Sequence, residues 1–153
     1  MPASSGMTRI LFPILSLLCL GLASCGTAYQ ADFRAMVRKA DANPATPEGP
    51  WKGTWKSDVN GHEGPLWCML SEGDDGEWDF RYRAGWGLMQ FGDYVHSVPA
   101  KKNPDGSISF KGKMDLPGGV GVHNVEGRVT KDEFEATYSS ERGDKGKMSL
   151  ARP

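Results

Sequence analysis

The stretch "WKGTWKS", residues 51–57, decides the fold class of this chain. Its polar and apolar residues alternate, so an extended backbone places Trp51, Gly53 and Trp55 together on one face. Lysine and threonine side chains occupy the opposite face. The pattern predicts a β-strand that is buried on one side and exposed to water on the other.

The same alternation returns along the rest of the chain. It is clearest in "WDFRYRA" (78–84), "SISFKGKMDL" (107–116) and "EFEATYS" (133–139). Runs at about 63–71, 87–98, 120–129 and 146–152 complete a set of roughly eight strands. Turn signals such as Asp75-Gly76 and Asn103-Pro104-Asp105-Gly106 separate them. The sequence therefore predicts an all-β domain.

A meander of this kind has two unpaired edges, and closure into a barrel removes both. Short connections between sequential strands favour an antiparallel up-and-down barrel of about eight strands, with a sandwich as the alternative. The composition agrees, because 20 glycines and 10 prolines in 153 residues suit a fold with many tight turns. A net charge of −1 with interspersed signs argues against a nucleic-acid partner.

The amino terminus carries the most specific motif. A short polar start ends in Thr8-Arg9, and an apolar run from Ile10 to Leu22 follows that is too short to cross a bilayer as an ordinary helix. The run ends in Leu22-Ala23-Ser24-Cys25, which resembles the lipobox of bacterial lipoproteins. The alternative is an ordinary signal peptide with a chance cysteine. Either Met1 or Met7 could be the start of translation.

The lipobox resemblance implies cleavage before Cys25, a diacylglycerol on its thiol and an acyl chain, usually palmitate, on its new amino group. The membrane would then be a partner through acylated Cys25. Gly26 stands where an inner-membrane retention signal would have aspartate, so the implied location is the bacterial cell envelope, at the outer membrane and facing the periplasm. Cys68 would be the single cysteine of the mature domain, a small buried residue unable to form an internal disulfide.

Residues 25–50 are predicted to form an acylated tether between the signal peptide (1–24) and the barrel domain (51–153). Apolar residues recur at helical spacing from Tyr29 to Ala40, which predicts a short amphipathic helix over about 28–41. We expect it to pack across the domain or to lie on the lipid surface. The proline-rich stretch 43–50 cannot continue this helix and is predicted to be a linker.

The triplet Gly53-Thr54-Trp55 is similar to the Gly-X-Trp signature of the calycin barrels, which include lipocalins and avidin-like proteins. In lipocalins an arginine from near the end of the barrel lies across that tryptophan at the closed end, and Arg152 is the counterpart implied here. The wider pattern from Gly53 to Pro153 resembles small, uncharacterised envelope proteins of environmental bacteria. That resemblance implies a fold rather than an activity.

Candidate chemistry is sparse. Asp58, His62, Glu63 and Cys68 lie within "SDVNGHEGPLWC" (57–68), but their spacing matches no metal-binding or nucleophile motif. Asn60-Gly61 is a strong hairpin signal, so His62 is expected at a solvated turn. We predict no catalytic residue, no metal and no cofactor, and a non-enzymatic protein. A metal-dependent hydrolase using the His62 region is the less favoured alternative.

The aromatic content is large for a domain of this size. It can fill the barrel, or it can line an open mouth that binds a small hydrophobic ligand. A cavity above about 300 Å³ would favour binding, and a filled barrel would favour a structural or protein-interaction lipoprotein that meets an envelope protein. The candidate ligand-binding residues are Trp55, Trp67, Trp78, Tyr82 and Trp86.

Overall fold

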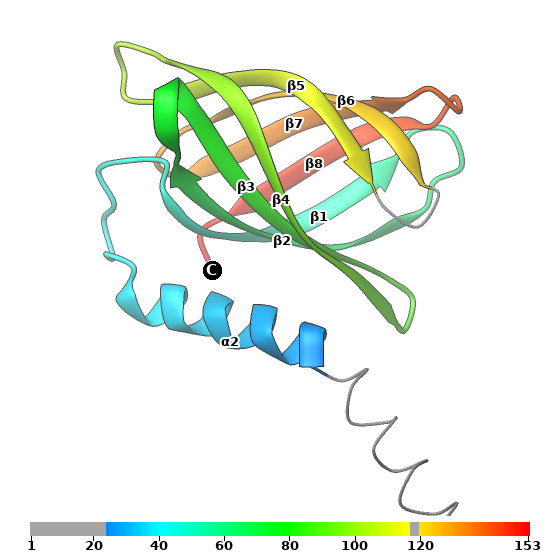
Figure 1. The fold of residues 1–153 in the computed structure, drawn as a ribbon, viewed down its shortest axis with the longest axis horizontal. Helices are drawn as coiled ribbons and strands as arrows, with labels where there is room; N and C mark the ends of the chain where they lie inside the picture. Colours follow the sequence, from blue (N-terminus) through cyan, green and yellow to red (C-terminus); the bar gives the residue numbers. More distant parts are fainter. Residues whose placement is uncertain (1–23, 117–119) are drawn as a thin grey trace, which may run out of the picture.

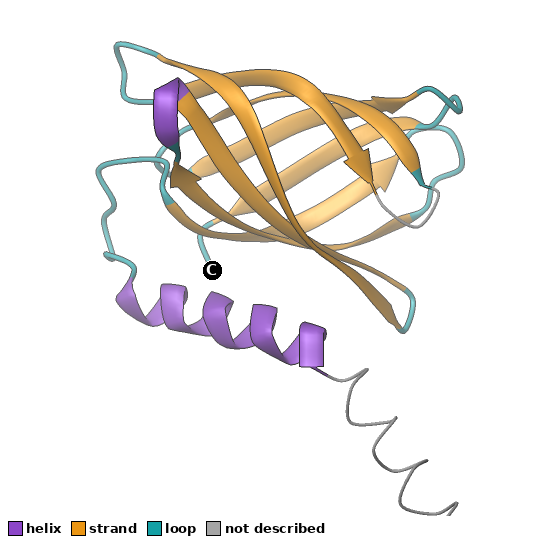
Figure 2. Cartoon of the chain, in the orientation of Figure 1, coloured by secondary structure: helices purple, strands orange, loops and turns teal. Residues whose placement is uncertain are grey.

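The computed structural model describes residues 24–116 and 120–153 and shows a closed antiparallel barrel with one helix against its outer wall (Figures 1 and 2). The predicted signal peptide falls on residues 1–23, outside the described residues, and the side chain of Cys25 lies outside them too. The elements are α2 (Ser24–Lys39), β1 (Gly49–Ser57), β2 (Glu63–Glu72), a 3₁₀ turn (Asp74–Gly76), β3 (Glu77–Trp86), β4 (Met89–Lys102), β5 (Ile108–Leu116), β6 (Gly121–Val129), β7 (Glu133–Ser140) and β8 (Lys145–Ala151).

Each strand pairs with the next along the chain, and β1 closes the barrel by pairing with β8. Trp55 lies opposite Gly64 of β2 on one side and Met148 of β8 on the other. The predicted up-and-down barrel is therefore confirmed, and the sandwich alternative is wrong. Closure pairs both edges of the meander, which is the physical reason for it.

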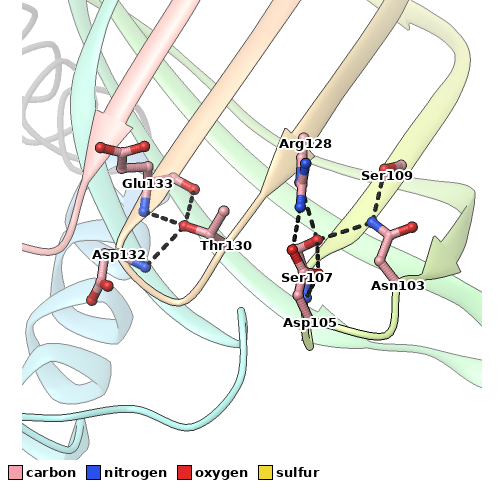
Figure 3. Close-up of polar contacts among 8 residues, drawn as sticks. All are labelled: Asn103, Asp105, Ser107, Ser109, Arg128, Thr130, Asp132 and Glu133. Carbon is pink, nitrogen blue, oxygen red and sulfur yellow. Dashed lines mark hydrogen bonds and ion pairs between the residues drawn. The ribbon is translucent and has the colours of Figure 1, made fainter.

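Polar side chains hold the β4–β5 turn at one end of the barrel (Figure 3). The Ser107 hydroxyl donates to Asp105 Oδ1 at 2.6 Å, and accepts hydrogen bonds from Asn103 Nδ2 at 2.9 Å and Arg128 Nε at 3.1 Å. Arg128 also forms an ion pair with Asp105. The hydrogen bonds from Ser107, with the nearby Arg128, lower the pKa of the Asp105 carboxyl. This end of the barrel is thus tied across β4, β5 and β6.

The neighbouring β6–β7 turn is stabilised by a threonine (Figure 3). The backbone amides of Asp132 and Glu133 donate to the Thr130 hydroxyl at 3.2 and 2.9 Å. Such a side-chain turn satisfies amides that have no strand partner.

Aromatic rings fill the half of the barrel interior that lies next to the β4–β5 and β6–β7 turns. The Phe80 and Phe110 ring centroids are 4.5 Å apart, and Phe134 lies 5.9 Å from Phe110 and 6.0 Å from Trp51. Trp51, Phe80 and Phe134 are completely buried. This half of the barrel is a packed core, as expected for the interior of a small barrel.

Arg152 covers Trp51 at the end of the barrel where β1 begins and β8 ends, called the closed end below. Its guanidinium carbon lies 3.9 Å from the centre of the Trp51 ring, and its nitrogens donate to the backbone carbonyls of Thr46, Glu48 and Lys131. The indole nitrogen of Trp51 donates to the Pro47 carbonyl at 3.0 Å. The pair thereby joins the end of the linker to the last strand.

The arginine expected across a Gly-X-Trp tryptophan is therefore present, but on a different tryptophan. The resemblance to calycins predicts that Arg152 lies across Trp55 of the Gly53-Thr54-Trp55 triplet. In the structure Arg152 covers Trp51 instead, which follows Gly49-Pro50. Gly49 has φ +122°, and a Cβ added there would lie only 2.6 Å from Arg152 Nη1. A glycine is needed at that position for both reasons.

Helix α2 packs against the outer wall of the barrel. Tyr29 and Phe33 are buried with Met69 of β2, while Met36, Val37 and Trp67 pack partly buried around them. The Tyr29 hydroxyl donates to the Arg81 carbonyl at 3.1 Å. The predicted amphipathic helix therefore exists and packs across the domain. Among the described residues no helix has the length and apolar character to span a membrane.

Replacing Tyr29 with alanine is expected to release α2 while leaving the barrel folded. The substitution removes a completely buried ring that stacks on Phe33 and contacts Arg81. Amide exchange should speed up across 29–37 and stay slow in the strands. Asp32→Asn is the matched control, because its ion pair with Arg81 is half-exposed and contributes less than about 1 kcal/mol. Equal exchange in both variants would contradict the packing described.

Candidate functional site

A cavity of about 200 Å³ lies inside the barrel at the end opposite to Arg152. This open end is where β1, β3, β5 and β7 finish. Aromatic and aliphatic side chains make most of the wall. The lining residues are Trp55, Leu66, Tyr82, Ala84, Phe91, Tyr94, Met114, Leu116, Val120, His123, Tyr138, Asp144 and Met148.

Trp55 is held in the wall by its indole nitrogen, which donates to the Gly85 carbonyl of β3 at 3.0 Å. The bond crosses over Gly64 of β2, where a Cβ would lie only 1.9 Å from that carbonyl oxygen. Only glycine fits at position 64, so the indole can reach across β2. A main-chain bond fixes the Trp55 ring in one orientation toward the cavity.

A β-bulge in β4 turns Phe91 toward the cavity. Tyr82 pairs with Tyr94, but the next inward pair is Ala84 with Phe91, so Gly92 and Asp93 together oppose a single residue of β3. Gly92 has φ +94°, which suits glycine at such a bulge. Because the extra residue shifts the alternation by one, Phe91 and Tyr94 both face the interior.

The pairing between β4 and β5 is the shortest between neighbouring strands of the barrel. These strands pair only through Ala100–Lys102 and Ile108–Phe110, near the closed end. Beyond that point β4 continues with β3 as a long hairpin that reaches past the neighbouring strands (Figure 1). Ala84, Phe91 and Tyr94 line the cavity, so the inner face of this hairpin forms part of its wall.

A few polar groups interrupt the apolar wall. His123 Nδ1 lies 3.0 Å from the Gly121 carbonyl, which can only accept, so Nδ1 carries the hydrogen. The Tyr138 hydroxyl donates to Asp144 Oδ2 at 3.4 Å, and Ser57 donates to Asp144 Oδ1 at 2.6 Å. The cavity thus combines a mainly hydrophobic wall with polar groups at one side, which is typical of sites for small molecules.

The Tyr138 hydroxyl is expected to make stability depend on alkaline pH. Burial, aided by the Asp144 carboxylate, raises the pKa of Tyr138 to about 12. A raised pKa in the folded state favours the neutral hydroxyl, so this contribution is complete below about pH 10 and is lost as the pH rises toward 12. Denaturant titrations of wild type and Tyr138→Phe should show a smaller alkaline loss in the variant. Parallel pH curves would contradict the assignment.

The structure places the predicted ligand-binding residues in different surroundings. Trp55 and Tyr82 line the cavity. Trp78 is buried in the packed core of the barrel, and Trp67 packs among the side chains under α2 on the outer wall. Trp86 stands 44% exposed near the tip of the β3–β4 hairpin. The structure therefore brings two of the five residues together in one site.

Other cavity residues were not anticipated from the sequence. Phe91 and Tyr94 belong to a run whose alternation is broken by the bulge, and Leu116 and Val120 flank the sequence Pro117-Gly118-Gly119. The signal that could have identified them is Gly92 within an otherwise strand-like segment, since an isolated strand glycine often marks a bulge.

The His62 region forms an exposed turn. His62 NH donates to Asn60 Oδ1 at 2.9 Å, Gly61 has φ +74°, and the imidazole packs 5.0 Å from the Trp86 ring. Cys68 is buried in the core, and burial raises the pKa of its thiol. Within the described part of the chain no cluster of three or more His, Cys, Asp or Glu side chains could hold a metal ion.

Comparisons with family models, with curated proteins and with solved structures gave no match. The class of the protein therefore rests on its architecture. It is a small, closed, eight-stranded antiparallel barrel with a helix packed on its wall, compatible with a calycin-like fold.

Proposed function

We propose that this protein is a lipid-anchored barrel of the bacterial cell envelope that binds a small apolar molecule and catalyses no reaction. The observation that carries the proposal is the apolar cavity at the open end, beside a closed end that is fully packed. The lipobox ending at Cys25 supports attachment to the membrane, and Gly26 supports the outer membrane.

The cavity volume restricts the size of the ligand. At about 200 Å³ the cavity falls below the ~300 Å³ given above as favouring ligand binding, and it is too small for a drug-sized ligand. An apolar cavity of about 150 Å³ holds one benzene-sized molecule. The site therefore suits a single-ring aromatic compound or the end of an aliphatic chain, and a longer ligand would extend out of the mouth.

Polar groups at one side refine the chemistry of the ligand. The His123 ring uses Nδ1 for the Gly121 carbonyl, which leaves Nε2 for a ligand, and Tyr138 supplies a hydroxyl. A ring that carries one hydroxyl can use such groups, whereas a carboxylate would lie near Asp144 and be repelled. We therefore favour neutral ligands over anionic ones.

The test uses toluene, p-cresol and benzoate as probes on the full chain. We expect toluene and p-cresol to raise the melting temperature and to change the fluorescence of Trp55, because binding only the folded state stabilises it. Benzoate should have little effect. Ala84→Leu, which places a larger side chain in the cavity wall, is the matched variant and should abolish both responses.

A structural lipoprotein is the second candidate, favoured by the packed aromatic core of the closed half. It predicts that none of the probes alters the melting temperature. It also predicts that Ala84→Leu is at least as stable as wild type, because filling a void adds contacts. Probe responses that persist in Ala84→Leu would place binding outside the cavity and overturn the proposed site.

A further inference from the structure

The tip of the β3–β4 hairpin exposes apolar side chains, of which Trp86 also packs against the His62 ring. Leu88 occupies the apex of the two-residue turn and is fully exposed, while Met89 is 60% exposed and Trp86 is 44% exposed. Gly87, with φ +58°, is the residue that the turn geometry requires. A polar residue at position 88 would serve the turn equally well, so the leucine indicates another role.

These side chains form one face that continues the cavity wall. In the hairpin Ala84 pairs with Phe91 and Trp86 pairs with Met89, and alternate pairs point to the same side. Ala84 and Phe91 line the cavity. The apolar lining of the barrel therefore extends without interruption onto the exposed tip.

The hairpin and the first turn of α2 lie at the same end of the molecule (Figure 1). The Arg83 guanidinium lies 5.9 Å from the Tyr29 ring and donates to the Gly92 carbonyl at 3.1 Å and to Gln90 Oε1 at 3.2 Å. Tyr29 thus contacts the base of the hairpin. Cys25 precedes Tyr29 by one helical turn, an axial distance of about 6 Å.

The charge pattern fits a lipid surface. Residues 84–92, "AGWGLMQFG", carry no charged side chain, although Arg83 and Asp93 flank them directly. Tryptophan is enriched at the boundary between lipid and water, and leucine and methionine enter the acyl region readily. Arg83 is buried beside Tyr29 and Asp93 pairs with Arg81, so neither charge has to enter the bilayer with the tip.

We propose that the Trp86–Phe91 tip inserts into the bilayer interface next to the acylated Cys25, so that the barrel mouth faces the lipid. This inference rests on the proposed lipid anchor. Two attachments at one end fix the orientation of the barrel, which a single flexible anchor cannot do. An apolar ligand could then pass between the bilayer and the cavity along the inner face of the hairpin without entering water.

The test places an environment-sensitive nitrobenzoxadiazole dye on Leu88→Cys in the full chain, expressed with its own leader and purified in lipidated form. Cys68 is completely buried and stays unlabelled. The labelled protein is reconstituted into phosphatidylethanolamine and phosphatidylglycerol vesicles that contain doxyl-labelled lipid. Val95→Cys is the matched control, since it is exposed on the same strand about 20 Å further from the tip.

We expect lipid quenching at position 88 to exceed that at position 95 by about twofold or more, since interfacial segments lie about 5–10 Å deep. Acylated protein with equal, weak quenching at both positions would overturn the hairpin insertion and leave the anchor standing. An intact mass without acyl chains would overturn the anchor and with it this inference. Dye emission that depends on the protein-to-lipid ratio would indicate contact with a second copy and would also overturn insertion.

Discussion

Replacing Trp51 with alanine will lower the free energy of unfolding by about 3–5 kcal/mol, the usual cost of deleting a buried aromatic ring. Trp51 is completely buried, packs 6.0 Å from the Phe134 ring and is covered by Arg152 at 3.9 Å. Its removal leaves a void at the closed end. It also deprives the Pro47 carbonyl of the indole donor. Urea denaturation followed by circular dichroism measures the loss.

Trp55→Ala is the matched control on the same strand. Trp55 is only partly buried and borders an existing cavity, so its deletion enlarges space that is already open and should cost clearly less. Arg152→Ala should lie between the two variants, because Arg152 covers the ring and holds three backbone carbonyls. Equal losses for Trp51→Ala and Trp55→Ala would contradict the assignment of Arg152 and Trp51 as the seal of the barrel.

The strands could be predicted because a small barrel imposes one simple rule on most of its residues. Each strand has one face in the core and one in water, so side chains alternate, as Glu133 to Ser140 do in full. Turn signals mark where the chain reverses. Closure followed from these short connections together with the cost of leaving two edges unpaired.

The closed end was harder to predict because proline obscured the start of the first strand. Gly49 and Pro50 read as the end of a linker, yet both belong to β1, where Pro50 is buried and Gly49 makes room for Arg152. The sequence has three Gly-X-Trp triplets, beginning at Gly49, Gly53 and Gly76, and the first two lie in the same strand. Only the position of Arg152, which is a long-range contact, distinguishes them.

The cavity wall could be predicted only in part because its formation depends on non-local events. Trp67 has an outward position in β2, and it is partly buried there only because α2 packs over that side of the barrel. Phe91 faces inward only because the bulge at Gly92 shifts the alternation. The alternation of polar and apolar residues in a strand reveals neither a helix that packs on the outer wall nor a one-residue shift caused by a bulge.

Replacing Cys25 with serine is expected to abolish acylation of the chain completely. The lipobox reaction requires the nucleophilic thiol, and a serine hydroxyl at that position is not a nucleophile of comparable strength. Each buried methylene contributes about 0.8 kcal/mol, so two or more chains on Cys25 would hold the protein stably at the membrane. The measurement is incorporation of an alkyne analogue of palmitate, together with the intact mass of the purified protein.

Cys68→Ala is the control that separates lipidation from a general effect of losing a cysteine. Cys68 is completely buried in the barrel, and burial raises the pKa of its thiol, so it is neither accessible nor ionised. This variant should incorporate the analogue as wild type does. If Cys25→Ser also kept its label, the acyl chain would be attached elsewhere. The hairpin tip would then lose the neighbouring anchor that orients the barrel mouth toward the lipid.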